Sequence, residues 1–299
     1  MSNPASGAEI RPMRPDDVAA ATAAVLRADW GDRRTWFEFA TTQPECRPIV
    51  AETGGAIVGT GVGTANGAVG WVGTIWVDPS ARGAGLGRRL TDRVIEDLEA
   101  AGCRTLLLVA TDEGRPLYER SGFQLQATYR ILETPGLGPD EVARPSGAPT
   151  GACRGDAARS GVRPYRADDL EAILALDRVA TGEDRGHVIR RFAAPDTTKV
   201  LDAKGSDAVA GFVIRAPWGG GATVVPDPVD ALQMLDARQR SSGPTGRVRV
   251  GLLDQNVDGL AALEAAGLKP IWSAPRLIRG EPLQWNPGWI WGQFNHAIG

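Results

Sequence analysis

The segment that decides the fold reads Val77-Asp-Pro-Ser-Ala-Arg82-Gly-Ala-Gly85-Leu-Gly87-Arg-Arg89. A strand-like apolar run at 71–77 ends where the segment begins. A helical pattern follows, in which apolar residues recur about every four positions up to Gly102. Free N–H groups at a helix start form an anion site together with the helix dipole, and glycines let a phosphate approach the backbone. The segment therefore predicts a strand, a phosphate-binding loop and a helix within an α/β domain.

Two familiar phosphate-binding patterns do not fit this loop. A P-loop needs Lys followed by Ser or Thr after its last glycine, and here Arg88-Arg89 stands in that place. The dinucleotide pattern Gly-x-Gly-x-x-Gly would need a glycine where Leu90 stands. The pattern that fits is Arg-x-x-Gly-x-Gly, at Arg82, Gly85 and Gly87.

The surrounding pattern predicts alternating helices and strands. Acidic residues at 16–17 introduce a helix, and two strands at 49–52 and 56–64 are joined through a Gly-Gly turn. A buried strand at 104–110, a short helix at 116–120 and a last strand at 123–132 follow the long helix. This order predicts a mixed sheet with helices packed against it.

The chain contains an internal repeat. Residues 10–18 (IRPMRPDDV) resemble 162–170 (VRPYRADDL), and residues 117–123 (LYERSGF) resemble 262–268 (ALEAAGL), in the same order and at nearly the same spacing. Residues 134–161 are rich in Pro, Gly, Ser and Ala and have no apolar period, which is typical of a linker. We therefore expect a domain at 1–133, a linker at 134–161 and a second domain at 162–299.

Two motifs of the first half resemble the signatures of the GNAT acyltransferase superfamily. They are Arg82-x-x-Gly85-x-Gly87 between strand and helix, and Leu117-Tyr118-Glu-x-x-Gly-Phe123 further on. The two-copy layout and the ending at 289–299 resemble bacterial tandem-GNAT proteins, whose second copy is usually degenerate. The resemblance implies two tandem GNAT-like domains, each a mixed, mostly antiparallel sheet flanked by helices. It also implies an N-acetyltransferase that uses acetyl-CoA as co-substrate.

The resemblance assigns roles to individual residues. Tyr118 would be the general acid that protonates the departing CoA thiolate, and Thr111 stands where many members have an asparagine that contacts pantetheine. The backbone of the preceding strand would pair with the pantetheine arm and thioester, and that of the loop would hold the pyrophosphate. These backbone positions are Ile75, Trp76 and Val77 in the strand, and Arg82, Gly83, Ala84, Gly85, Leu86, Gly87 and Arg88 in the loop. Four arginines either reach the 3′-phosphate of CoA or form solvated helix faces: Arg88, Arg89, Arg115 and Arg120.

The general base is left open. The strand at 71–77 has no carboxylate, and the remaining acidic candidates are Asp29, Asp32, Glu38 and Asp112. We expect an ordered-water relay rather than any one of them. No Cys or Ser has a paired His, so direct attack of the amine in a ternary complex is expected.

The second copy lacks both functional motifs. No Arg-x-x-Gly-x-Gly follows its sheet region at 209–225, and Leu263 stands in the place of Tyr118. Asn256 stands where the family asparagine would be, which indicates ancestry without supplying an acid. The second domain is therefore expected to be non-catalytic. The tryptophans at 30, 36, 272, 285, 289 and 291 either wall an acceptor pocket or pack the core, and we favour packing.

Composition narrows the partners. The net charge is −3, without the basic excess typical of nucleic-acid or anionic-membrane binding. Three scattered cysteines do not make a disulfide framework or a metal site, so no metal is expected. No apolar run is long enough to span a membrane and no secretory signal is visible, so a cytoplasmic protein is expected. We expect a small-molecule amine acceptor. A protein or peptide acceptor, a non-catalytic acyl-CoA sensor and a homodimer stay open.

Overall fold

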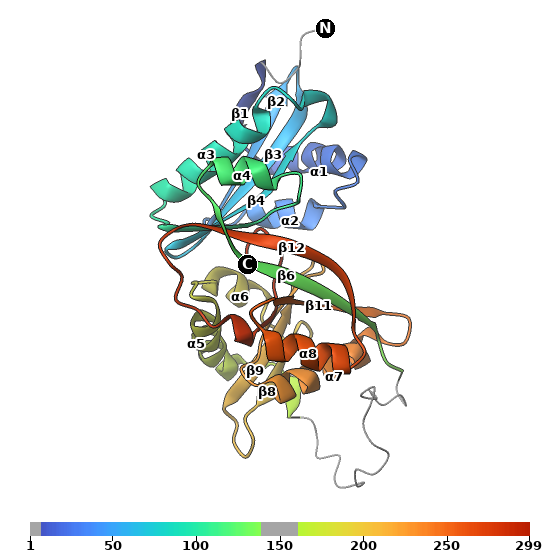
Figure 1. The fold of residues 1–299 in the computed structure, drawn as a ribbon. Coiled ribbons are helices and arrows are strands. Elements are labelled where there is room, and N and C mark those ends of the chain that lie inside the picture. The colour runs from blue at the N-terminus through green and yellow to red at the C-terminus, as the bar shows by residue number, and fades with distance from the viewer. Residues whose placement is uncertain (1–6, 139–160) are drawn as a thin grey trace. The chain divides into compact units, whose positions relative to one another are not determined.

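The structure is a computed structural model that describes residues 7–138 and 161–299 (Figure 1). The chain forms two compact units. The first unit comprises the chain up to Gln126 together with Arg276–Leu283 and Asn295–Gly299. The second unit comprises Ala127–Pro275 and Gln284–Phe294. These bounds differ from the continuous ranges expected from the sequence. The chain returns to the first unit at two later segments, Arg276–Leu283 and Asn295–Gly299.

The expected linker at 134–161 is covered only at its ends. Strand β6 (Gln124–Pro135) continues through Pro135, so the first residues of that range belong to a strand rather than to a linker. Residues 139–160, with Cys153 among them, lie outside the described residues.

The first unit is built on one mixed sheet. Its strands are β1 (Glu9–Pro12), β2 (Cys46–Thr53), β3 (Ala56–Asn66), β4 (Val69–Val77) and β5 (Thr105–Val109), in that order across the sheet, followed by the end of β12 (Lys269–Gly280) from Arg276 onward. Only the β4–β5 pair is parallel among these neighbours. The helices are α1 (Val18–Arg27), α2 (Arg34–Ala40), α3 (Leu86–Ala100) and α4 (Arg115–Arg120). The predicted helices and strands are confirmed, whereas β1, α2 and the returning strand were not predicted.

Helices cover both faces of this sheet. Alternate glycines of β3 leave room for α3: a Cβ on Gly61 would lie 3.1 Å from Val94, and a Cβ on Gly63 would lie 3.1 Å from Leu98. In Figure 1 α3 lies on one side of the strands, and α1 and α2 lie on the other. Residues 295–299 join the α1–α2 face, where the Thr64 hydroxyl donates a hydrogen bond to the carbonyl of Ala297 (2.9 Å).

The second unit repeats much of this plan. One sheet has the order β13 (Ile290–Gly292), β10 (Gly221–Val224), β9 (Val209–Arg215), β8 (Thr198–Asp202) and β7 (Val162–Pro164), with antiparallel neighbours throughout. Strand β11 (Arg247–Leu253) pairs antiparallel with β6. The helices are α5 (Leu170–Thr181), α6 (Gly186–Phe192), α7 (Pro228–Ser242) and α8 (Val257–Ala265). Both units are therefore α/β, with mostly antiparallel sheets and flanking helices.

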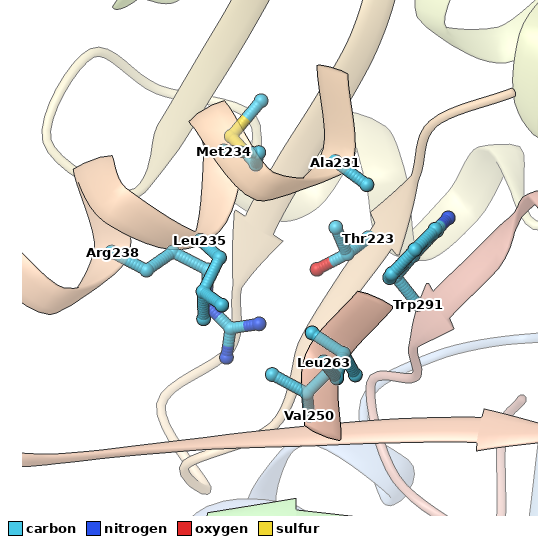
Figure 2. A pocket seen from close by; sticks show the side chains of 8 residues that line it. All are labelled: Thr223, Ala231, Met234, Leu235, Arg238, Val250, Leu263 and Trp291. Atoms are coloured by element: carbon cyan, nitrogen blue, oxygen red, sulfur yellow. The ribbon is translucent and has the colours of Figure 1, made fainter. Parts of the chain in front are cut away.

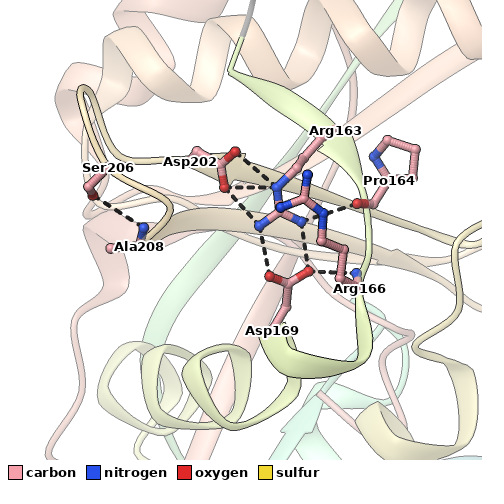
Figure 3. A network of polar contacts seen from close by, with 7 residues as sticks. All are labelled: Arg163, Pro164, Arg166, Asp169, Asp202, Ser206 and Ala208. Carbon is pink, nitrogen blue, oxygen red and sulfur yellow. Dashed lines mark hydrogen bonds and ion pairs between the residues drawn. The ribbon is translucent and has the colours of Figure 1, made fainter.

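Arg163, on β7, links the segment just before α5 to the sheet of the second unit (Figure 3). The Arg163 guanidinium donates to both oxygens of Asp169 (2.8 and 2.7 Å) and to Asp202 on β8 (2.9 Å). The Arg166 N–H also donates to Asp169 (2.6 Å). These hydrogen bonds to the carboxylate, chiefly from Arg163, lower the pKa of Asp169.

The first unit has the same network at the corresponding positions. The Arg11 guanidinium donates to both oxygens of Asp17 (2.7 and 2.8 Å) and to Glu52 on β2, and the Arg14 N–H donates to Asp17 (2.7 Å). The similarity of residues 10–18 and 162–170 thus reflects one repeated anchor between strand and helix. It supports a duplicated origin of the two units.

Candidate active site

The two parallel strands of the first unit separate along their length. Strands β4 and β5 pair only at Val69, Gly70 and Trp71, and the rest of β4, from Val72 to Val77, has no pairing with β5. On its other side, β4 stays paired with β3 as far as Val77. The end of β4 therefore presents backbone N–H and C=O groups that β5 does not use, as expected for the strand before the loop.

A bulge distorts β4 where the strands separate. The β3–β4 register shifts between Thr60 and Val62, and opposite this shift Thr74 has φ +53°. A β-branched residue is strained in this left-handed region, and such strain persists only where neighbours hold it. Trp36 Nε1 donates to Thr74 Oγ1 (3.0 Å), and Thr60 Oγ1 donates to the Thr74 carbonyl (2.9 Å). Bulges of this kind are over-represented beside active sites.

The loop after β4 leaves a row of backbone amides without acceptors. Gly83 and Gly85 have φ +85° and +76°, a conformation that glycine adopts without strain. Gly85 is the N-cap of α3 and no side chain caps this helix. In the part of the chain that the structure describes, no group accepts the N–H groups from Gly83 to Arg88. The loop is mostly exposed, so these amides form a cradle for an anion.

The elements that carry the predicted residues converge. A Cβ on Gly87, in the first turn of α3, would lie 3.6 Å from Val77 on β4 and 3.8 Å from Leu117 on α4. The start of α3, the end of β4 and α4 are therefore adjacent. This brings the predicted pyrophosphate loop, pantetheine strand and tyrosine helix together.

Tyr118 lies half-buried on α4. Its ring packs edge-on against Phe123, with ring centroids 6.3 Å apart. Burial raises the pKa of Tyr118 to about 12, so the phenol is protonated at neutral pH. Within residues 7–138 and 161–299, nothing is hydrogen-bonded to its hydroxyl. The hydroxyl is thus available to donate to a ligand.

Thr111 has a structural role at the start of the same helix. Its hydroxyl oxygen accepts the Gly114 N–H (3.1 Å), and its carbonyl accepts the Arg115 N–H (2.9 Å). The hydroxyl can still donate one hydrogen bond. Its expected contact with pantetheine stays a prediction.

The arginines near the loop have local partners rather than a common target. Arg82 Nε donates to the Val77 carbonyl (3.2 Å), Arg89 donates to the Ala8 carbonyl (2.8 Å), and Arg88 pairs with Asp92 (3.4 Å). Arg115 pairs with Glu119 (2.7 Å), whereas Arg120 is exposed and forms no ion pair with the described residues. Binding of a 3′-phosphate by any of these side chains stays a prediction.

None of the proposed carboxylate bases is buried. The Asp32 carboxylate accepts the Arg34 N–H (2.8 Å) at the start of α2, and Asp29, Glu38 and Asp112 are exposed. Trp36 is buried and supports the Thr74 bulge, a link that sequence reasoning missed. The positive φ of Thr74 has no signal in the sequence that we could have used.

In the second unit a strand of the chain itself occupies the edge corresponding to that of β4. Strand β13 pairs antiparallel with β10, with Thr223 opposite Gly292 and Val224 opposite Ile290. Trp291 Nε1 donates to the Val225 carbonyl (2.9 Å). The Trp291 ring lies among Thr223, Val250 and Leu263, the counterpart of Tyr118, in a small apolar pocket (Figure 2).

The helix start of the second unit is also closed to anions. The Asp227 carboxylate, at the N-cap of α7, accepts the N–H groups of Val229 (2.7 Å) and Asp230 (3.4 Å). Gly85 holds the equivalent N-cap in the first unit and has no side chain to do this. Only the first unit therefore has an uncapped, glycine-lined helix start after the corresponding strand.

Comparison with known proteins also distinguishes the first unit from the second. Residues 14–123 match the acetyltransferase (GNAT) family model. A Trypanosoma brucei brucei glucosamine 6-phosphate N-acetyltransferase is 40% identical over 66 residues, which cover 22% of this chain and 45% of that protein. An Azospirillum brasilense IAA acetyltransferase is 37% identical over 86 residues, covering 27% and 56%. The chain thus spans about half the length of these curated relatives.

Two crystal structures are similar over nearly the whole chain. A Pyrococcus horikoshii protein assigned as an acetyltransferase has a TM-score of 0.78 at 19% identity, covering 98% of this chain and 96% of that one. A tandem GNAT protein from the clavulanic acid biosynthesis pathway has a TM-score of 0.61 at 17% identity, covering 92% and 99%. Residues 14–123 thus match the GNAT acetyltransferase family, and the fold of nearly the whole chain is similar to that of a tandem GNAT protein.

Other kinds of site were also sought. Among the described residues, no group of three or more His, Cys, Asp and Glu side chains is placed to hold a metal ion. Cys46 and Cys103 are buried free thiols. No helix in the described ranges is both long and apolar enough to span a membrane.

Proposed function

We propose that the first unit transfers an acetyl group from acetyl-CoA to a primary amine of a small molecule. The observation that carries the proposal is the row of acceptor-free amides from Gly83 to Arg88, beside the separated edge of β4 and the available hydroxyl of Tyr118. The family model that matches residues 14–123 and the names of the relatives support the same chemistry.

The chain's own backbone would hold the acetyl-CoA. The amides between Gly83 and Arg88 suit a pyrophosphate, because they offer several donors and the helix dipole adds positive charge. The free edge at Ile75, Trp76 and Val77 suits the amide groups of pantetheine, which would pair with it as a strand does. The thioester would then lie toward the bulge at Thr74.

Catalysis would rest mainly on positioning. The amine nitrogen attacks the thioester carbonyl, the N–C bond forms and the C–S bond breaks, without a covalent enzyme intermediate. A backbone N–H of the separated strand would stabilise the oxyanion. The amine loses its extra proton to water, in line with the absence of a buried carboxylate among the four acidic candidates.

Tyr118 would donate to the departing sulfur. With a pKa of about 12, its phenol is a weaker acid than an ordinary thiol, whose pKa is about 8.5. Transfer of the proton to a fully formed thiolate is therefore unfavourable. In place of the full proton transfer expected of a general acid, its main contribution would be a hydrogen bond that strengthens as negative charge develops on sulfur.

The second unit would be non-catalytic, since β13 covers the edge of β10 and Asp227 caps α7. Leu263 also offers no acid. The expected stoichiometry is one acetyl-CoA per chain.

The test combines calorimetry with an acetyl-transfer assay. Titration of the full chain should give one acetyl-CoA per chain, and thiol release should depend on an added amine. The amine panel should include amino sugars, polyamines, amino acids and peptides, so that small-molecule and peptide acceptors are separated. Binding without transfer to any of these would favour the sensor function, and two sites per chain would contradict our assignment of the second unit.

A further inference from the structure

Arg33 is unusual among the arginines of the first unit. It is half-buried just before α2. Among the described residues, no group forms a hydrogen bond or ion pair with its guanidinium. The other half-buried or buried arginines of this unit each donate to a carboxylate, carbonyl or amide oxygen: Arg11, Arg47, Arg93, Arg115, Arg276 and Arg279.

The surroundings of Arg33 do not neutralise it. Desolvation lowers the pKa of Arg33, and the carboxylate that opposes this shift is that of Asp32, which already caps the Arg34 N–H (2.8 Å). Burial and the charge of Arg33 lower the pKa of His296 to about 4. His296 is therefore uncharged at neutral pH. The half-buried guanidinium of Arg33 therefore keeps a positive charge that Asp32 offsets only in part, and no described residue is hydrogen-bonded to it.

Arg33 belongs to the structure that supports the β4 bulge. It precedes Trp36 by one helical turn, and the Phe37 N–H donates to its carbonyl (2.9 Å). Trp36 in turn holds the side chain of Thr74.

The segment at 295–299 reaches the bulge from the same face. A Cβ on Gly73 would overlap Ala297, the residue after His296. The Asn66 side-chain amide also donates to the carbonyl of Ile298 (2.9 Å). Arg33 and His296, which interact electrostatically, are thus linked through Trp36 and Ala297 to the part of β4 that carries Gly73 and Thr74.

We propose that Arg33 binds an anionic group, a carboxylate or a phosphate, on the acceptor, so that the first unit acts on amines that also carry a negative charge. This inference rests on the proposed acetyl transfer and specifies its substrate class. An arginine fork matches both anions in a bidentate manner, and a partly desolvated site strengthens the pairing. The uncharged imidazole of His296 leaves Arg33 as the local charge that selects the acceptor.

The experiment compares matched pairs of acceptors. Glucosamine 6-phosphate is set against glucosamine, and glutamate against glutamine amide, with acetyl-CoA and the full chain. For wild type we expect the anionic member of at least one pair to have the higher kcat/KM. The Arg33→Gln variant should lower that value by about 10- to 100-fold, as expected for a lost charged hydrogen-bond pair, and leave the neutral member within about twofold. The pair that responds tells phosphate from carboxylate.

Arg34→Gln is the matched control, because it removes an exposed arginine at the next position. It should leave both members of each pair unchanged. Thermal unfolding should show that Arg33→Gln is folded, since no described residue is hydrogen-bonded to the guanidinium that the change removes. Equal loss for neutral and anionic acceptors, or no loss in Arg33→Gln, would overturn the inference.

A binding measurement separates this inference from the proposed function. Calorimetric titration of the anionic amines into the CoA-loaded protein should show an affinity that depends on Arg33. Such binding without turnover would refute the transfer reaction and retain the anion site. No binding by wild type, or equal binding by wild type and Arg33→Gln, would refute the anion site, whatever the activity.

Discussion

The amide cradle makes a sharp prediction for Gly85→Glu. This change places a carboxylate at the N-cap of α3, next to the N–H groups that we assign to the pyrophosphate. An acidic side chain at an N-cap can accept those N–H groups itself, as Asp227 does in the second unit. The variant would thus fill the cradle with its own negative charge.

The expected loss of acetyl-CoA affinity follows from the amides at stake. A hydrogen bond to a charged group contributes about 1.5–3 kcal/mol, and two or more such bonds would be lost. Repulsion between the new carboxylate and the pyrophosphate adds about 1 kcal/mol or more at contact distance. The affinity should therefore fall by about 4 kcal/mol or more, which is roughly 700-fold, since 1.4 kcal/mol corresponds to a factor of ten.

The assay is calorimetric titration of acetyl-CoA, with Gly55→Glu as the matched control. Gly55 lies in the β2–β3 turn with φ +78°, close to the +76° of Gly85, and a Cβ meets nothing within 4 Å at either position. Both variants thus bear similar backbone strain and the same added charge. Gly55→Glu should bind acetyl-CoA like wild type. Equal binding by all three proteins would refute the cradle, and equal loss in both variants would attribute the effect to strain.

Three further predictions follow from single contacts. Tyr118→Phe should lower kcat by about 10- to 100-fold. The acetyl-CoA affinity and the melting temperature should change little, because the hydroxyl has no partner within the described residues. Unchanged steady-state rates would contradict the role of Tyr118. Asp169→Asn should lower the free energy of unfolding by about 2–3 kcal/mol at pH 7, as measured by urea unfolding. Arg163 lowers the pKa of Asp169 in the folded protein, so this stabilisation is present above the ordinary Asp pKa of 3.8 and is lost as the pH falls through the folded pKa. Wild type and variant should therefore converge in acid, and a constant difference down to pH 2 would contradict the ion pair. Trp291→Ala should lower the free energy of unfolding by about 3–5 kcal/mol, because the ring is buried in the core that contains Leu263 and lines the small pocket there (Figure 2); a loss below about 1 kcal/mol would show that Trp291 contributes little to this core.

Local pattern was sufficient for most elements of the first unit. The glycines at 54–55, the Asp78-Pro79 pair and Gly102 each end an element where the structure ends it. The repeat at 10–18 and 162–170 correctly indicated duplication, because the Arg-Asp anchor that makes both segments similar is local in sequence. These features depend on contacts within a few residues or within one hairpin.

The parts that escaped prediction depend on distant residues. Residues 276–283 and 295–299 belong to the first unit because they contact partners such as β5 and Gly73, more than 160 positions earlier. The local sequence pattern of these two segments does not indicate those partners. Strand β13 covers β10 for a similar reason. The strain at Thr74 is imposed by Trp36 and Thr60, so neither propensity nor periodicity at Thr74 could have revealed it.

The two units differ most informatively at one backbone position. Both place a long helix, α3 or α7, after a corresponding strand, β4 or β10. In the second unit the N-cap is Asp227, whose carboxylate satisfies the helix amides and repels anions. In the first unit the N-cap is Gly85, which leaves the same amides to a ligand and accepts a left-handed conformation without a Cβ. A helix start without a side-chain cap lacks roughly 1 kcal/mol of stabilisation that a capped one has. An anion bound to those amides would restore it only while it is present, and this is why we assign the proposed acyl-donor site to the unit with the uncapped helix.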